Sequence, residues 1–219
     1  MIDKLNKENG GDYGVTIVQP LAGGLVDKLN AQDGRYSLYL RGLLKGEKVE
    51  ETRIVDCVTR GINPYINTDE FFDCAKNPDL RFIVSNTTEA GIEYKPNQNP
   101  DDFNGLTFPG RLTLFMKKRF DEGLGGFILL PCELIDKNGD NLKECILKYS
   151  EDWGYGVEFE KWIETENHFT NTLVDRIVTG YPRDNAKEME QSYGYLDDMI
   201  DTAEIFHLWV IEGDKKLAE

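Results

Sequence analysis

The sequence predicts an α/β protein whose mainly parallel sheet has helices on both faces, with an inserted β-ribbon. Three observations predict this fold. Short apolar stretches alternate with amphipathic ones between residues 53 and 153, a run of alternating apolar residues stands apart at 36–44, and the pattern changes from about Gly156. Strands that alternate with helices favour right-handed βαβ crossovers and parallel pairing.

The expected strands are short runs rich in β-branched and aromatic residues, and they cover residues 15–18, 36–44, 53–58, 80–84 and 127–130. Helices are expected between and after them. Thr68 resembles an N-cap, and Pro78 ends that helix. A second helix covers 112–120 and stops at Gly123, and a third covers 142–153, just after an Asn-Gly-Asp turn.

Two features are expected to interrupt or follow the parallel sheet. Asp33-Gly34 and Lys45-Gly46 are turn pairs on either side of the run at 36–44, so an antiparallel ribbon is expected there. We place a domain boundary near residue 165. Residues 1–165 form the first domain, and residues 166–219 form a junction and the beginning of a helical domain.

Composition excludes several classes of function. The 219 residues include 40 acidic and 25 basic side chains, and the net charge of −15 disfavours nucleic acid as a partner. A solvated surface is the simplest explanation of this acidity. The four cysteines lack metal-ligand spacing, so no metal is expected. No apolar run suits a membrane span or a signal peptide, which indicates a cytoplasmic protein without a membrane partner.

Polar side chains follow two of the expected strands, and ligands of open α/β sheets bind beyond the carboxyl ends of strands. Residues 85–91 read Ser-Asn-Thr-Thr-Glu-Ala-Gly and could hold a nicotinamide ribose. A loop that only caps itself explains the segment equally well. Glu133 follows the strand at 127–130, where it is expected to share a crevice with Glu89. Asp136-x-Asn138 does not fit a calcium loop, so a tight turn is expected there.

Other motifs are ambiguous or absent. Asp175 and Arg176 are adjacent among apolar residues, which indicates either a polyol-binding carboxylate or an ion pair at the domain junction. Gly23-Gly24 lacks the third glycine of a dinucleotide fingerprint. The sequence has no Walker loop, zincin helix or serine-hydrolase elbow.

Four segments together resemble the mannitol dehydrogenase family of long-chain polyol dehydrogenases, and within it the branch that acts on altronate. They are FIVSNTTEAGIEY (82–94), GFILLPCELIDKNGD (126–140), NTLVDRIVTGYPRD (171–184) and IDTAEIFHLWVIEG (200–213). The resemblance implies a Rossmann-type domain followed by a helical substrate domain. It also implies NAD as the cofactor and interconversion of D-altronate and D-tagaturonate, a small-molecule sugar acid pair, by hydride transfer.

The resemblance implies roles for several residues. Asn86, Thr87, Thr88 and Glu89 are expected to line the nicotinamide end of the cofactor site. Asp175, with Arg176 beside it, is expected to contact the substrate. Relatives that act on mannitol have an alkoxide-stabilising asparagine where this sequence has Leu134, and Asn138 is a weak substitute for it. Gln19 stands where an acidic residue normally accepts the ribose hydroxyls of NAD.

The family's glycine-rich phosphate loop and catalytic lysine are expected to lie outside these 219 residues, the lysine beyond Glu219. The Rossmann-type sheet is therefore expected to be incomplete and the isolated chain inactive. A missing first strand would leave apolar sheet edges, so self-association or disorder near residues 1–30 is expected. The alternatives are a non-catalytic α/β module that binds a nucleotide or a partner, and another polyol dehydrogenase of the mannitol or fructuronate type.

Overall fold

The computed structural model describes residues 1–213, which divide into two compact units. Unit 1 joins Met1–Pro64 to Asp175–Leu208, and unit 2 joins Tyr65–Val174 to the segment that starts at Trp209. Both units mix helices with strands, and every strand pair of the β1–β4 and β5–β6–β7 sheets is parallel. The predicted α/β class with mainly parallel pairing is thus confirmed. The boundary near residue 165 stays a prediction.

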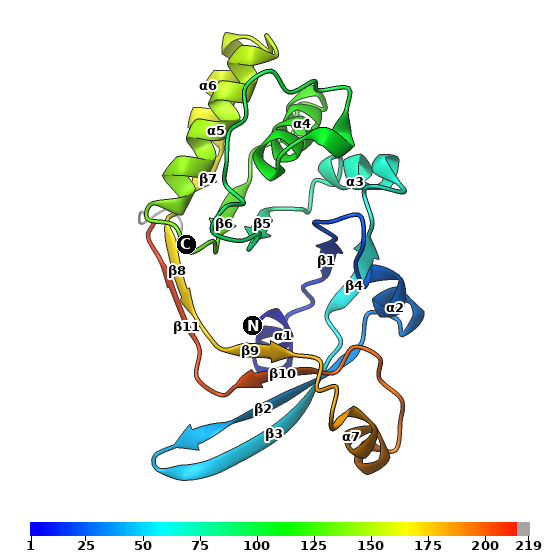
Figure 1. Ribbon diagram of the computed structural model, residues 1–219. Coiled ribbons are helices and arrows are strands. Elements are labelled where there is room, and N and C mark those ends of the chain that lie inside the picture. The colour runs from blue at the N-terminus through cyan, green and yellow to red at the C-terminus, as the bar shows by residue number, and fades with distance from the viewer. Residues whose placement is uncertain (214–219) are drawn as a thin grey trace. The chain divides into compact units, whose positions relative to one another are not determined.

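Unit 2 is built on a parallel sheet in the order β5-β6-β7. Helices α4 and α5 pack together, and α5 also packs against β6 and β7, as Figure 1 shows. Its elements are α3 (Thr68–Ala75), β5 (Phe82–Ser85), the 3-10 turn η1 (Phe103–Gly105), α4 (Phe108–Asp121), β6 (Ile128–Pro131), α5 (Asn138–Asp152), α6 (Val157–Glu166) and β7 (His168–Phe169).

Aromatic side chains fill the core of unit 2. Phe115 of α4 stacks on Phe127, which directly precedes β6, with ring centroids 5.7 Å apart. Phe159 and Trp162 of α6 stack at 5.9 Å. The buried guanidinium of Arg119 donates to four backbone carbonyls between residues 75 and 125, and burial lowers its pKa. A single side chain therefore ties α4 to the turn that leads from α3 into β5.

The helices of unit 2 begin close to their predicted positions. The N-cap of α3 is Asn67, whose side chain accepts from the backbone N–H of Glu70 at 3.1 Å, so the predicted Thr68 is the first helical residue. Helix α4 begins four residues earlier than predicted, after Thr107, whose hydroxyl accepts from Gly110 N–H. Both caps satisfy an N–H group that a helix cannot satisfy internally.

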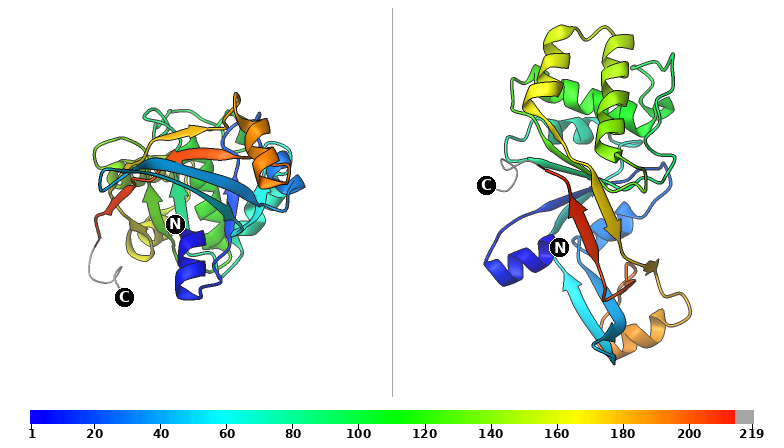
Figure 2. Two further views of the ribbon diagram at one scale, coloured as in Figure 1. Left: turned by 90° about the horizontal axis from the view of Figure 1, so that it is seen from below. Right: turned by 90° about the vertical axis from the view of Figure 1, so that its left-hand side faces the viewer.

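Unit 1 contains a two-stranded parallel sheet, β1-β4, and a four-stranded sheet in the order β3-β2-β10-β9. Strands β2 and β3 form the predicted antiparallel ribbon, joined by the turn at Lys45-Gly46, and α7 lies beside it in Figure 2. The elements are α1 (Ile2–Asn9), β1 (Val15–Val18), α2 (Val26–Ala31), β2 (Tyr36–Leu44), β3 (Glu47–Val55), β4 (Val58–Ile62), β9 (Val178–Gly180), α7 (Ala186–Tyr193) and β10 (Asp201–Glu204).

The single strand predicted at 53–58 is in fact the end of β3 and the start of β4. Val55 and Val58 both belong to the buried cluster around Leu29. Between them, the backbone N–H of Asp56 donates to the carboxylate of Asp3 on α1. The chain therefore leaves its antiparallel partner β2 at Val55 and joins its parallel partner β1 at Val58.

Residues 166–213, the expected junction and beginning of a helical domain, contain more strands than helices. They contain β7, β9, β10 and α7, together with a pair made by β8 (Thr172–Asp175) and β11 (Leu208–Ile211). Strand β10 pairs in parallel with β2, about 160 positions earlier in the sequence. Pairing with so distant a segment stabilises strands that the local pattern does not reveal.

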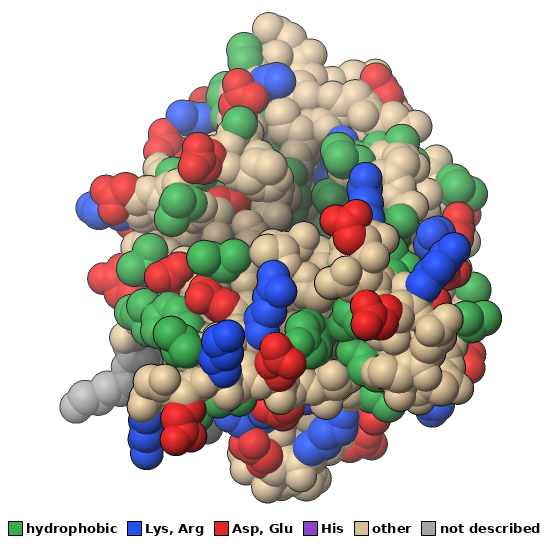
Figure 3. Space-filling view, turned by 60° about the horizontal axis from the view of Figure 1, so that its bottom comes forward, with side chains coloured by type: hydrophobic (Ala, Val, Ile, Leu, Met, Phe, Trp, Pro, Cys, Tyr) green, Lys and Arg blue, Asp and Glu red, His purple; other side chains and the backbone are tan. Residues whose placement is uncertain are grey.

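Two surface properties bear on possible partners. Acidic and basic side chains are interspersed with apolar ones on the face drawn in Figure 3. In the part of the chain that the structure describes, no helix combines the length and the apolar character needed to cross a bilayer.

Candidate cofactor site

Two loops of unit 2 begin side by side at the carboxyl edge of its sheet. The last residue of β5, Ser85, lies opposite the last residue of β6, Pro131, in the parallel register. The segment 86–91 therefore starts beside the segment 132–137. Carboxyl ends of neighbouring parallel strands are where α/β folds bind nucleotides and substrates.

The loop after β5 presents polar side chains to solvent. Asn86, Thr88 and Glu89 are exposed, and Thr87 is half-buried. The backbone of Thr88 has φ 138°, a value that L-residues and β-branched ones above all rarely adopt. Such conformations persist where neighbouring contacts hold them, and they are concentrated at functional sites.

Glu133 is placed differently from the prediction, which put it at the mouth of a crevice with Glu89. Only 2% of its surface is exposed, whereas Glu89 is exposed. Its carboxylate accepts hydrogen bonds from the hydroxyl of Ser85 at 3.1 Å, from the N–H of Thr87 at 3.0 Å and from the hydroxyl of Thr87 at 2.9 Å. Glu133 thus lies on the buried side of the loop that follows β5 and anchors that loop by hydrogen bonds.

Asn138 is 0% exposed, and its hydrogen-bonding groups are occupied. Its Nδ2 donates to the carbonyls of Pro131, Glu133 and Thr172, and its Oδ1 accepts from Gly139 and Thr172 N–H groups. No donor remains for a substrate oxygen. The structure therefore gives Asn138 a structural role at the start of α5. Leu134, at the position of the family's asparagine, is 65% exposed and offers no polar group.

Asp175 and Arg176, at the start of the second segment of unit 1, are not joined to each other in the part of the chain that the structure describes. The Arg176 guanidinium donates to the carbonyl oxygen of Glu204 at 3.0 and 3.1 Å, so it attaches the turn between β8 and β9 to the end of β10. Asp175 is exposed at the end of β8. The arginine is used structurally, and the carboxylate is available to a ligand.

Gln19 follows β1 in unit 1, and its side chain is buried. Its Nε2 donates to the carbonyls of Leu21 at 2.7 Å and Ala22 at 3.1 Å, and its Oε1 accepts from Val26 N–H at 3.4 Å. The amide shapes the turn that leads into α2, and both of its N–H groups are occupied. Contact with a ribose hydroxyl stays a prediction.

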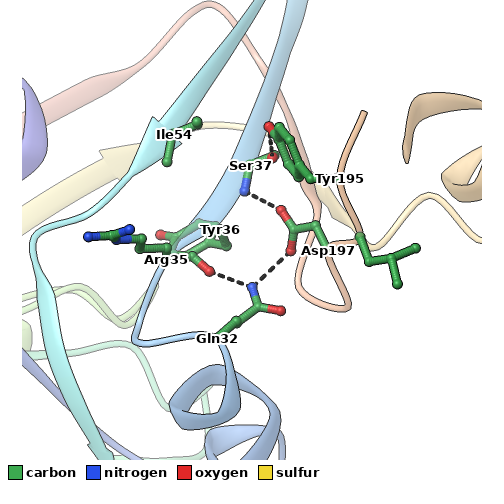
Figure 4. Close-up of a pocket in the computed structure, with 8 residues that line it drawn as sticks. Gln32, Arg35, Tyr36, Ser37, Ile54, Tyr195 and Asp197 are labelled. Atoms are coloured by element: carbon green, nitrogen blue, oxygen red, sulfur yellow. Dashed lines mark hydrogen bonds between the residues drawn. The ribbon is translucent and has the colours of Figure 1, made fainter. Parts of the chain in front are cut away.

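Unit 1 also contains a pocket of about 230 Å³ at the start of β2, drawn in Figure 4. The buried carboxylate of Asp197 accepts from Ser37 N–H at 2.6 Å, from Gln32 Nε2 at 2.9 Å and from Met199 N–H at 2.9 Å. These bonds attach the segment after α7 to β2. None of the predicted site residues lines this pocket.

The residues at the carboxyl edge of unit 2 fit the nicotinamide end of a dinucleotide. Asn86 offers an exposed amide, and Thr88 and Glu89 offer an exposed hydroxyl and carboxylate. Ribose hydroxyls and a carboxamide both donate and accept hydrogen bonds, so this set of side chains is complementary to them. Among the described residues, no group of three or more metal-ligating side chains is present.

Parallel strands with polar loops at one carboxyl edge define the class of the protein, a nucleotide-binding α/β domain of the Rossmann type. The chain belongs to the family described as the mannitol dehydrogenase Rossmann domain, which matches residues 1–219. The family relationship expected from the sequence is confirmed.

Similar proteins agree with this assignment. The chain is 45% identical to the altronate oxidoreductases of Cronobacter sakazakii and Shigella flexneri over 222 aligned residues, which cover 99% of the chain and 46% of each relative. The chain therefore spans about half the length of these curated relatives.

Two known structures share the fold. A substrate-free D-sorbitol dehydrogenase has a TM-score of 0.79 with 23% identity, and the match covers 97% of this chain and 46% of that one. Pseudomonas fluorescens mannitol 2-dehydrogenase, in a ternary complex with NAD and D-mannitol, has a TM-score of 0.81 with 20% identity and covers 96% and 45%. At these identities the likeness demonstrates the fold alone.

Proposed function

We propose that this chain supplies the cofactor-binding part of an NAD-dependent oxidoreductase that interconverts D-altronate and D-tagaturonate. One structural observation carries most weight: the exposed, polar loop 86–89 leaves the carboxyl edge of the sheet with a strained backbone that a buried carboxylate holds in place. The altronate specificity is taken from the relatives that are 45% identical.

Within this proposal the residues divide by role. Asn86, Thr87, Thr88 and Glu89 contact the nicotinamide ribose and ring, and Asp175 contacts the sugar acid. A mannitol-type or fructuronate-type substrate is the alternative within the same chemistry, and competition among the three substrates in a complete enzyme distinguishes them. The proposed location is the cytoplasm, where NAD(H) and hexuronates are both available.

Calorimetric titration with NADH tests the cofactor assignment directly. Replacing Asn86 with alanine removes an exposed amide without disturbing the core, so we expect at least tenfold weaker binding, which is about 1.4 kcal/mol, and an unchanged melting temperature. Thr165→Ala is the matched control, because Thr165 is exposed near the end of α6, which leads into the opposite, amino edge of β7.

Micromolar binding that Asn86→Ala weakens and Thr165→Ala leaves unchanged supports the proposal. Absence of NADH binding to the wild-type chain at millimolar concentration contradicts it and favours the module without cofactor. Binding that is equally strong in both variants contradicts the placement of the nicotinamide at this loop.

A further inference from the structure

Glu133 is a buried carboxylate with three hydrogen-bond donors and, among the described residues, no ion-pair partner. Isolated buried charge is costly, and proteins retain it where it is hydrogen-bonded or functional. Hydrogen bonding alone does not require a charge at position 133. The neutral amide oxygen of a glutamine there could accept the same two hydrogen bonds from Thr87.

The position of the charge is informative. Glu133 lies two residues beyond β6 and holds Thr87, two residues beyond β5, by both its N–H and its hydroxyl. Thr88, the strained residue, comes next in the chain. The carboxylate is therefore directly behind the loop to which the proposed function assigns the nicotinamide ring.

The neighbouring thiol also lies close to this negative charge. Burial raises the pKa of Cys132, and the charge of Glu133 adds to the increase. Leu134 on the other side is exposed and carries no charge to offset it. No described side chain forms an ion pair that would neutralise the carboxylate.

The two forms of the cofactor differ in the charge of the nicotinamide ring, which is +1 in NAD⁺ and zero in NADH. A fixed negative charge close to the ring stabilises the oxidised form and leaves the reduced form almost unaffected. Hydrogen-bonded positioning of the loop, in contrast, affects both forms equally.

We propose that Glu133 is a positioning residue that holds the 86–89 loop and, through its charge, makes the site prefer the oxidised over the reduced nicotinamide. The inference rests on the proposed cofactor function and deepens it. The charge of Glu133 shifts the equilibrium of the bound cofactor toward NAD⁺ from outside the loop, in addition to the exposed carboxylate of Glu89 within it.

The experiment compares the dissociation constants of NAD⁺ and NADH for the full 219-residue chain by calorimetry. Glu133→Gln keeps the size of the side chain and removes its charge. We expect NAD⁺ affinity to fall about tenfold more than NADH affinity, the size of a unit-charge interaction across roughly 10 Å at an effective dielectric constant of about 20. Glu164→Gln, on the exposed surface of α6, is the control and leaves the ratio unchanged.

A second variant does not disturb the buried cluster. Leu134→Lys places a positive charge beside Glu133 at an exposed position. It should therefore weaken NAD⁺ binding more than NADH binding, as Glu133→Gln does, whereas Leu134→Gln should not change the ratio of the two dissociation constants. This pair keeps the inference testable if Glu133→Gln does not fold.

The outcomes are distinct. Equal changes in both affinities, or an unchanged ratio in Leu134→Lys, overturn the charge preference and leave the proposed function intact. A wild-type chain that binds neither NAD⁺ nor NADH rejects the proposed function and the inference with it. A ratio that changes in both charge variants and in neither control supports the inference.

Discussion

At the scale of single residues, the structure separates side chains that serve the fold from exposed polar side chains that are accessible to a ligand. Asn138 and Arg176 were predicted as substrate contacts, and both donate hydrogen bonds to backbone carbonyls, Arg176 through Nε and Nη2. Asn86 and Asp175 are exposed polar side chains. Sequence reasoning singled out these segments but could not tell buried from exposed polar side chains within them.

Removing the Asn138 side chain should destabilise unit 2 strongly. Asn138→Leu removes the hydrogen bonds to the carbonyls of Pro131, Glu133 and Thr172 and to the N–H of Thr172. The Pro131 and Glu133 carbonyls each keep a second donor, whereas the two Thr172 groups lose the bond that Asn138 makes. Each unsatisfied buried group costs about 1–3 kcal/mol. We expect a loss of about 3 kcal/mol or more in the free energy of unfolding, measured with urea. Asn141→Leu, which removes one bond to Asp136, should cost below about 1 kcal/mol. Equal losses in the two variants would refute this role of Asn138.

Tyr36 should make unit 1 sensitive to alkali. Burial, with a smaller effect of Asp201, raises the pKa of its phenol from 10.0 to about 12. Since the folded pKa is raised, the stabilisation is fully present below pH 10 and is lost as pH rises toward 12. The loss should reach about 1–3 kcal/mol.

The variant Tyr36→Phe lacks this ionisation, so its stability should fall less between pH 10 and 12 than that of the wild type. Tyr13→Phe is the control, because Tyr13 is exposed. Chemical unfolding at a series of pH values measures the difference, and parallel curves for wild type and Tyr36→Phe would contradict the assignment.

At the scale of elements, the order of strands and helices between residues 53 and 153 was predictable because local periodicity determines it. The β-ribbon was predictable because its turn pairs are local too. The break at Asp56 and the strands after residue 166 were not, because they depend on pairing with distant segments, as β10 does with β2. The burial of Glu133 was not predictable for the same reason. The sequence shows an acidic residue after an apolar strand, but that residue is buried only when β5 and β6 pair.

The close packing of α5 against the end of β7 depends on Gly139. An added Cβ there would overlap the backbone carbonyl of Thr170, which cannot move without disturbing β7. Gly139→Ala should therefore destabilise unit 2 by about 2 kcal/mol or more. Gly125→Ala meets no atom within 4 Å and has no left-handed backbone, so it should be close to neutral. Thermal unfolding compares them, and a neutral Gly139→Ala would contradict this packing argument.

At the scale of the whole molecule, cofactor binding and turnover are expected to separate. The chain spans 46% of the length of its altronate oxidoreductase relatives, and we expect turnover to require residues from the rest of that length. Incubation of the 219-residue chain with NADH and tagaturonate should give no loss of absorbance at the NADH band. Turnover at the rate of an ordinary dehydrogenase would contradict this expectation.

The edge of β5 in unit 2 is expected to favour association with another chain. In the described residues, β5 pairs only with β6, and its Phe82 and Val84 side chains are 46% and 57% exposed. An apolar strand with one unpaired edge is a template for pairing with another chain. We expect concentration-dependent association in light scattering. Val84→Lys should reduce it, since charge on an edge strand opposes pairing, whereas Val157→Lys, at an even more exposed valine at the start of α6, should leave it unchanged. A wild-type chain that stays monomeric at every concentration would exclude association through this edge.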